Sequence, residues 1–82
     1  MMAENQNTSD TPDWKPLTAL IGVPAAQDFM YMGAGSDGLR LYKHIMTRRY
    51  LNIDGNGQTW SYQGAGYVPL DRIAALAHVG LG

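Results

Sequence analysis

Clusters of glycine divide most of the chain into short segments. The length of these segments favours strands that pair with their neighbours in the sequence. Glycines recur within 33–38, 55–57 and 64–66. Between these clusters, apolar and polar side chains alternate with the period of two that is typical of a half-buried strand. A crossover between parallel strands needs about a dozen residues or more, so hairpins must join the segments. The sequence therefore predicts an α+β fold built on a small antiparallel β-meander of three to five strands, with a small open barrel as the alternative.

Helices are expected on both sides of this meander in the sequence. Residues 1–12 contain no large apolar side chain after the two initial methionines, so we expect a disordered tail, and 13–82 should form one small domain. The apolar spacing over 14–21 predicts a short N-terminal helix, which Pro24 would prevent from continuing. Helical spacing over about 70–79 predicts a C-terminal helix that packs on one face of the sheet.

Four strands and a short edge strand account for the middle of the chain. We expect the strands at about 28–33, 39–45, 48–53 and 58–62, and the edge strand at 67–68, ending at Pro69. Residues 24–33 also fit a helix, but the run Phe29–Met32 before a glycine-rich loop favours a strand. Asn56–Gly57 predicts a tight hairpin. No turn residue separates Ile45 from Arg48, so a bulge in a long bent strand or an irregular link is expected there.

Strand alternation also predicts which side chains face the core. In 39–45 the side expected to be buried carries Leu39, Leu41 and Ile45, and the side expected to be exposed carries Arg40, Tyr42 and His44. In 48–53 the buried side should carry Arg49, Leu51 and Ile53, and the exposed side Arg48, Tyr50 and Asn52. We therefore expect Arg49 to be structural, with its stem over the core margin and its head on a carboxylate, and Arg48 to be functional.

Composition excludes several classes of function. The 82 residues include no cysteine, which excludes disulfides, thiolate zinc sites, iron–sulfur clusters and thiol catalysis. No run of about 18 apolar residues occurs and no secretory signal is recognisable, so we expect a soluble cytoplasmic protein that does not bind membranes. Six Lys and Arg against seven Asp and Glu give a net charge of −1, which argues against a dedicated nucleic-acid binder.

Three motif-like patterns lack the context that their chemistry requires. Gly33, Gly35 and Gly38 match a dinucleotide fingerprint, but a strand follows where the fingerprint opens a helix. The loop at 54–58 resembles the start of a calcium loop but lacks the downstream Glu. The two histidines, at 44 and 78, have no partner at metal-ligand spacing. No nucleophile stands in a recognisable catalytic motif. We expect no enzyme activity, no catalytic residues, no cofactor and no metal.

A basic and aromatic stretch over 40–50 is the best candidate for function. Arginine and lysine can pair with anionic groups, and aromatic rings are enriched at interfaces. The candidate binding residues are Arg40, Tyr42, His44, Arg48, Tyr50 and Trp60. Our first hypothesis is a non-catalytic binding or protein-interaction module whose partner is another protein or a second copy of the chain, met by strand addition or by dimerisation. The alternative is a weak single-stranded nucleic-acid binder.

The same stretch carries a resemblance. It reads YKHIMTRRYLNID over 42–54 and is followed by Trp60, Tyr62 and Tyr67. This pattern resembles one in small uncharacterised bacterial proteins that share a domain of unknown function, and it covers roughly residues 29–79. The resemblance implies a compact bacterial domain and brings no activity or catalytic residue with it.

Overall fold

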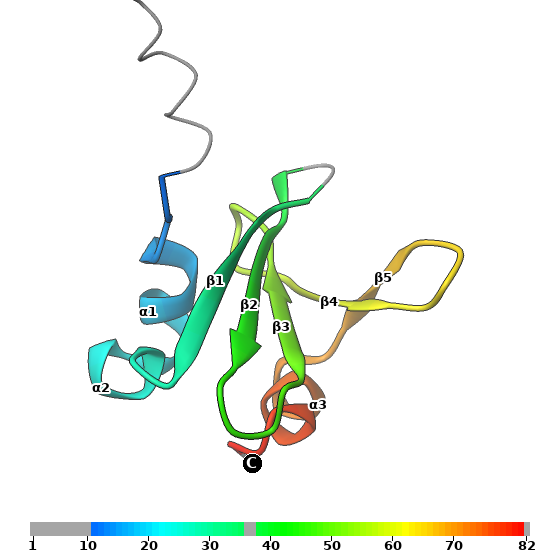
Figure 1. Ribbon diagram of the computed structural model, residues 1–82. Helices are drawn as coiled ribbons and strands as arrows, with labels where there is room; N and C mark the ends of the chain where they lie inside the picture. Colours follow the sequence, from blue (N-terminus) through cyan, green and yellow to red (C-terminus); the bar gives the residue numbers. More distant parts are fainter. Residues whose placement is uncertain (1–10, 36–37, 82) are drawn as a thin grey trace, which may run out of the picture.

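The fold is a five-stranded antiparallel meander with three short helices. The computed structural model describes residues 11–35 and 38–81. The strands are β1 (Phe29–Ala34), β2 (Arg40–His44), β3 (Tyr50–Ile53), β4 (Thr59–Tyr62) and β5 (Tyr67–Leu70). Each strand pairs with the next in the sequence, so that β1 and β5 form the two edges (Figure 1). The α+β class predicted from the sequence is confirmed, whereas the tail expected over 1–12 falls mostly outside the described residues.

Two helices precede the sheet. Helix α1 (Lys15–Ile21) follows the predicted spacing and ends at Gly22, whose φ of 89° is a backbone conformation that favours glycine. Helix α2 (Val23–Ala26) is a single turn that begins directly afterwards. The ambiguous stretch 24–33 therefore contains both of the structures that it resembles, first a helical turn and then, from Phe29, the predicted strand.

Helix α3 (Arg72–His78) closes the chain. Asp71 caps it, because Oδ2 accepts a hydrogen bond from the backbone N–H of Ala74 at 3.2 Å. The helix is shorter than the predicted 70–79, since Leu70 still belongs to β5. Strand β5 thus continues through Pro69, although the edge strand was predicted to end there. A proline without an N–H is tolerated there because β5 is an edge strand.

Residues 45–49 form a turn that links β2 to β3, so of the two alternatives expected there the bulge in one long bent strand is wrong and a link between two strands is present. The backbone N–H of Arg48 donates to the carbonyl of His44 at 2.8 Å, and Arg48 has a φ of 66°. His44 takes the part that Asn or Asp usually plays in a turn. Its Nδ1 accepts hydrogen bonds from the backbone N–H groups of Met46 and Thr47 at 3.1 and 3.2 Å.

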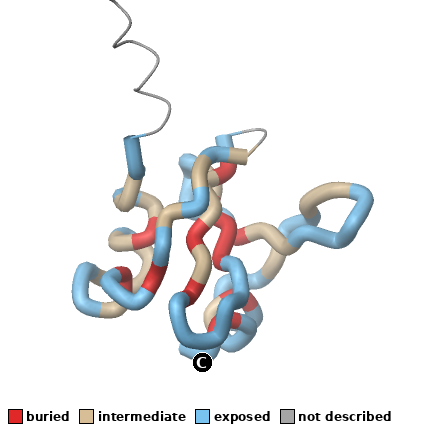
Figure 2. Tube along the Cα trace, viewed as in Figure 1, coloured by how far each residue is buried: buried red, intermediate tan, exposed pale blue. Residues whose placement is uncertain are grey.

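All three helices contribute to one core on one face of the sheet. The buried side chains of this core are Leu17, Ala26, Phe29, Tyr42, Leu51, Ile53, Ala75 and Val79. Figure 2 shows the corresponding buried stretches running through the middle strands and along the sides of the helices that touch them. The β4–β5 hairpin extends away from this centre as an arm (Figure 1).

The predicted facing of β3 is confirmed for its apolar residues, and Leu39, just before β2, is buried as predicted, but the facing predicted within β2 is wrong. Leu51 and Ile53 are buried as expected, but Asn52, which was predicted to be exposed, is only 4% exposed. In β2, Tyr42 is fully buried and His44 is 8% exposed, whereas Ile45 is 46% exposed. Tyr42 lies directly opposite Leu51 in the hairpin, so the two side chains share a face. Its hydroxyl also donates to the carbonyl of Asp13 at 2.6 Å, which satisfies the buried polar group.

Candidate binding groove

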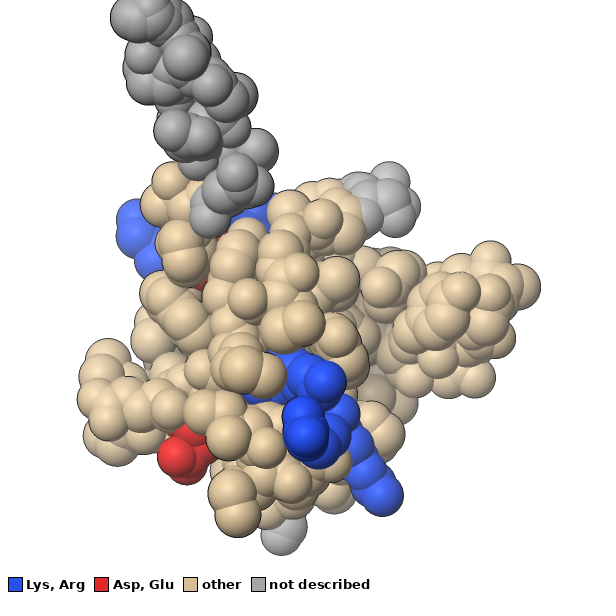
Figure 3. All heavy atoms as spheres, viewed as in Figure 1, with Lys and Arg blue, Asp and Glu red and all other residues tan. Residues whose placement is uncertain are grey.

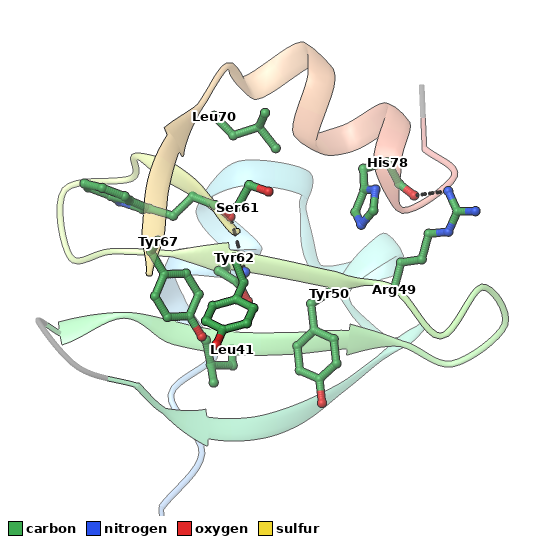
Figure 4. A pocket seen from close by; sticks show the side chains of 10 residues that line it. Leu41, Arg49, Tyr50, Ser61, Tyr62, Tyr67, Leu70 and His78 are labelled. Atoms are coloured by element: carbon green, nitrogen blue, oxygen red, sulfur yellow. Dashed lines mark hydrogen bonds between the residues drawn. The ribbon is translucent and has the colours of Figure 1, made fainter. Parts of the chain in front are cut away.

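A groove of about 490 Å³ lies between the middle strands, the β4–β5 arm and the last turn of α3. Its wall consists mainly of side chains from the middle strands and the β4–β5 arm: Leu41, Tyr50, Asn52, Trp60, Tyr62 and Tyr67. Arg49 and His78 line one end, where the last turn of α3 approaches the sheet (Figure 4). We call this cavity the aromatic groove. It combines open ring surface, a buried amide and a guanidinium group.

Hairpin register brings the aromatic rings together. Tyr62 and Tyr67 are directly opposite each other on β4 and β5, and their ring centroids are 5.2 Å apart. The hydroxyl of Tyr62 donates to the carbonyl of Gly64 at 2.8 Å, which fixes a ring that is still 61% exposed. Tyr50 projects from the sheet on the same side (Figure 4). The rings therefore present a partly fixed apolar surface to a ligand.

Trp60 is held from outside the groove. Its indole Nε1 donates to Oδ2 of Asp54 at 3.0 Å. The other oxygen of Asp54 accepts hydrogen bonds from the backbone N–H groups of Asn56 and Gln58 at 2.8 and 3.0 Å. The hydrogen bond from Trp60, followed by those from the backbone, holds the pKa of Asp54 below its usual value. The β3–β4 turn thus orients the indole ring.

Asn52 is the one polar side chain of the groove that is almost completely buried. It is 4% exposed and lies opposite Trp60 in the β3–β4 pair. Its Nδ2 donates to the carbonyl oxygen of Trp60 at 3.2 Å. A carbonyl oxygen can accept a hydrogen bond only from the NH₂ group of the Asn52 amide. This bond therefore fixes the direction in which the amide oxygen, Oδ1, points. Among the residues that the structure describes, no donor reaches the Asn52 Oδ1 atom.

Basic side chains gather beside the groove, over the β2–β3 hairpin (Figure 3). This hairpin carries Lys43, Arg48 and Arg49 near its turn. Lys43 Nζ lies 5.9 Å from the centre of the Tyr50 ring, and Arg49 Nη1 donates to the backbone carbonyl of His78 at 3.3 Å. Within the described residues, no carboxylate forms an ion pair with any of these three cations. The head of Arg49 thus reaches a helix carbonyl, where the sequence analysis expected a carboxylate.

The six binding residues predicted from the sequence do not form one surface. Tyr50 and Trp60 line the groove, and Arg48 lies in the adjoining turn. The other three project toward the helices, and two of them are buried. Arg40 forms an ion pair with Asp13 at 3.1 Å, and the burial of Tyr42, with the nearby Asp13 carboxylate, raises the pKa of its phenol.

Only Tyr50 and Trp60 of the ten residues that line the groove were among the predicted ones. Of the other eight, Asn52, Tyr62 and Tyr67 matter most to its chemistry. Strand alternation already placed Asn52 on the same side as Tyr50. A polar side chain among aromatic neighbours could therefore have marked Asn52 as a candidate binding residue. Tyr62 and Tyr67 stand symmetrically around the turn at 64–66, which is the pattern of a cross-strand pair.

Comparison with known proteins identifies no relative: no family model, no curated protein and no solved structure matches the chain. In the described part of the chain, no group of three His, Asp or Glu side chains is placed to hold a metal ion. Nor does any described helix have the length and apolar character needed to cross a bilayer. The chemistry of the groove is therefore the basis for a functional assignment.

Proposed function

We propose that the chain is a small non-catalytic interaction module that binds another protein through the aromatic groove. The observation that carries this proposal is a sheet face on which Tyr50 and Tyr62 are exposed beside a half-buried Trp60, while the opposite face holds the core. Tyrosine and tryptophan are enriched at protein interfaces because each contributes a large apolar ring and a polar group with few rotatable bonds.

The groove suits a partner better than the edge of the sheet at β5 does. Strand addition requires an edge strand with a continuous row of backbone donors and acceptors. Pro69 removes one donor from β5, which is the edge beside the groove. A partner segment lying across the open face can instead use the rings directly. Dimerisation through this face would use the same residues, so a second copy of the chain is the alternative protein partner.

Comparative capture from the native cell tests the proposal. Wild-type protein, Tyr62→Ser and Ile73→Ser would be immobilised, and bound proteins would be quantified by mass spectrometry. Ile73 is the matched control because it is 77% exposed on α3 and lies outside the groove. We expect a partner that Ile73→Ser retains and Tyr62→Ser loses. Sedimentation of the isolated chain measures self-association. Failure to recover a partner, together with a monomeric chain, would contradict the proposal.

A second candidate function is weak binding of single-stranded nucleic acid. Lys43, Arg48 and Arg49 favour it, since three cations without ion pairs in the described part of the chain stand beside rings on which bases can stack. Binding through three phosphates should weaken with salt, with a log–log slope of about −2 for single strands. Titration of mixed-sequence DNA and RNA with wild type and with the double variant Arg48→Ala, Arg49→Ala distinguishes the two functions. The bacterial origin and cytoplasmic location expected from the sequence stay predictions.

A further inference from the structure

Asn52 carries a buried hydrogen-bond acceptor that the fold leaves unused. Oδ1 belongs to a side chain that is 4% exposed, and it has no donor among the described residues. Such an atom loses its hydrogen bonds to water on folding and gains none in return, so each example calls for an explanation. The atom belongs to a residue that lines the aromatic groove. The Oδ1 atom itself exposes less than 1 Å², so the donor of a ligand in the groove reaches it once the side chains that cover it move aside.

We propose that Asn52 Oδ1 accepts a hydrogen bond from a backbone N–H of an extended, acidic segment of the partner protein. This inference rests on the proposed function and names the chemistry that the groove recognises. An extended segment presents backbone N–H groups toward each side at alternate residues. One of them can reach the base of the groove while neighbouring side chains pack on the rings of Tyr50 and Tyr62.

The acidic character of the segment follows from charge. Arg49 lines one end of the groove, and Lys43 lies beside the Tyr50 ring. Within the described residues, neither cation has a carboxylate in ion-pair contact. A carboxylate of the partner at that end would complement the charge of the exposed Arg49 and that of the half-buried Lys43.

The acceptor is fixed before the ligand arrives. The Asn52 amide is oriented by its bond to the Trp60 carbonyl, and the Trp60 indole is in turn held by Asp54. A fixed acceptor loses little conformational freedom on binding, which favours affinity and makes the position of the partner's N–H specific. Asn52 therefore sets the register of the bound segment.

Selection of peptides by the wild-type protein gives the probe for a test. A phage library of random twelve-residue peptides would be selected against the full chain, and one enriched peptide would be labelled with fluorescein. We expect the enriched peptides to be acidic. The Kd of the labelled peptide would be measured for wild type, Asn52→Leu and Asn56→Leu. Asn56 is the control because it is an exposed asparagine in the turn outside the groove. We expect a loss of about tenfold or more for Asn52→Leu only.

Single N-methylation along the peptide removes one backbone N–H at a time. We expect one position at which N-methylation weakens binding to wild type about tenfold but leaves binding to Asn52→Leu nearly unchanged, because the two changes remove the same bond. The scan on wild type needs no variant, so it stays informative if Asn52→Leu does not fold.

The outcomes separate the inference from the proposed function. If the library yields no binder, the proposed function fails. Another outcome is that peptides bind wild type and Asn52→Leu equally, with no N-methyl position that weakens binding. That result would leave the proposed function standing and refute the role of Asn52. It is the result expected if a bound water already donates to Oδ1. If selected peptides are not acidic, the charge argument is overturned. Salt-sensitive binding of oligo(dT) that requires Asn52, in the absence of peptide binders, would assign the groove to nucleic acid instead.

Discussion

Replacing Asn52 by leucine should stabilise the free protein while it removes a determinant of binding. The substitution deletes Oδ1, a buried acceptor whose lack of a partner costs about 1–3 kcal/mol. It also deletes the hydrogen bond from Nδ2 to the Trp60 carbonyl, which contributes about 0.5–1.5 kcal/mol. Leucine is close to asparagine in shape, so little cavity or strain is added. The difference predicts a net gain of about 1 kcal/mol.

Urea unfolding followed by tryptophan fluorescence measures this change. For a domain of 82 residues, a gain of about 1 kcal/mol corresponds to a rise in Tm of about 4–8 °C. The exposed control Asn56→Leu should stay within about 0.5 kcal/mol of wild type. If Asn52→Leu instead loses about 1 kcal/mol or more, Oδ1 is satisfied in the free protein, and the argument that it is reserved for a ligand is refuted.

Three further predictions concern the fold and its response to pH. Arg48→Gly should raise stability to urea by about 0.5 kcal/mol, because a φ of 66° is strained for arginine and free for glycine; a loss would show that the Arg48 side chain makes a stabilising contact. Tyr42→Phe should lower stability by about 1 kcal/mol at neutral pH through loss of the bond to Asp13. Because burial raises the pKa of Tyr42, wild-type stability should hold below about pH 10 and fall as the pH rises further, and chemical unfolding of Tyr42→Phe should show a smaller alkaline fall. The hydrogen bond from Trp60 is the main cause of the lowered pKa of Asp54. The contribution of this carboxylate to the free energy of unfolding should therefore be present above about pH 4 and should fall as the pH drops further. Asp54→Asn should show a smaller fall at acid pH in chemical unfolding.

The positions of the strands were predictable because they depend on local chemistry. Glycine clusters and the period-two alternation mark the turns and strands from residue 28 onward, and Asn56–Gly57 lies in the predicted hairpin between β3 and β4. The β2–β3 turn was missed because its stabilising group is the imidazole of His44, which turn statistics do not favour. A histidine acceptor is recognisable only when the backbone conformation is known.

The facing of β2 was not predictable from alternation, since both of its sides carry large apolar groups. Leu41 faces the groove and Tyr42 faces the helices. Tyrosine is amphipathic, and its burial depends on a partner for the hydroxyl. That partner is the carbonyl of Asp13, 29 residues away in the sequence. The position of Asp13, just before α1, therefore helps to decide which side of β2 is buried.

The low stability expected of so small a domain supports a binding role for Asn52. A domain of 82 residues without cysteine depends on packing and hydrogen bonds alone, and its core yields on the order of 3–5 kcal/mol. A buried acceptor without a partner removes a large part of that amount. Leucine in place of Asn52 would avoid this cost and would still fit a strand beside Trp60 and Leu41. An asparagine at this position, with Oδ1 unpaired in the described part of the chain, therefore fits the proposed hydrogen bond to a bound segment better than a purely structural role.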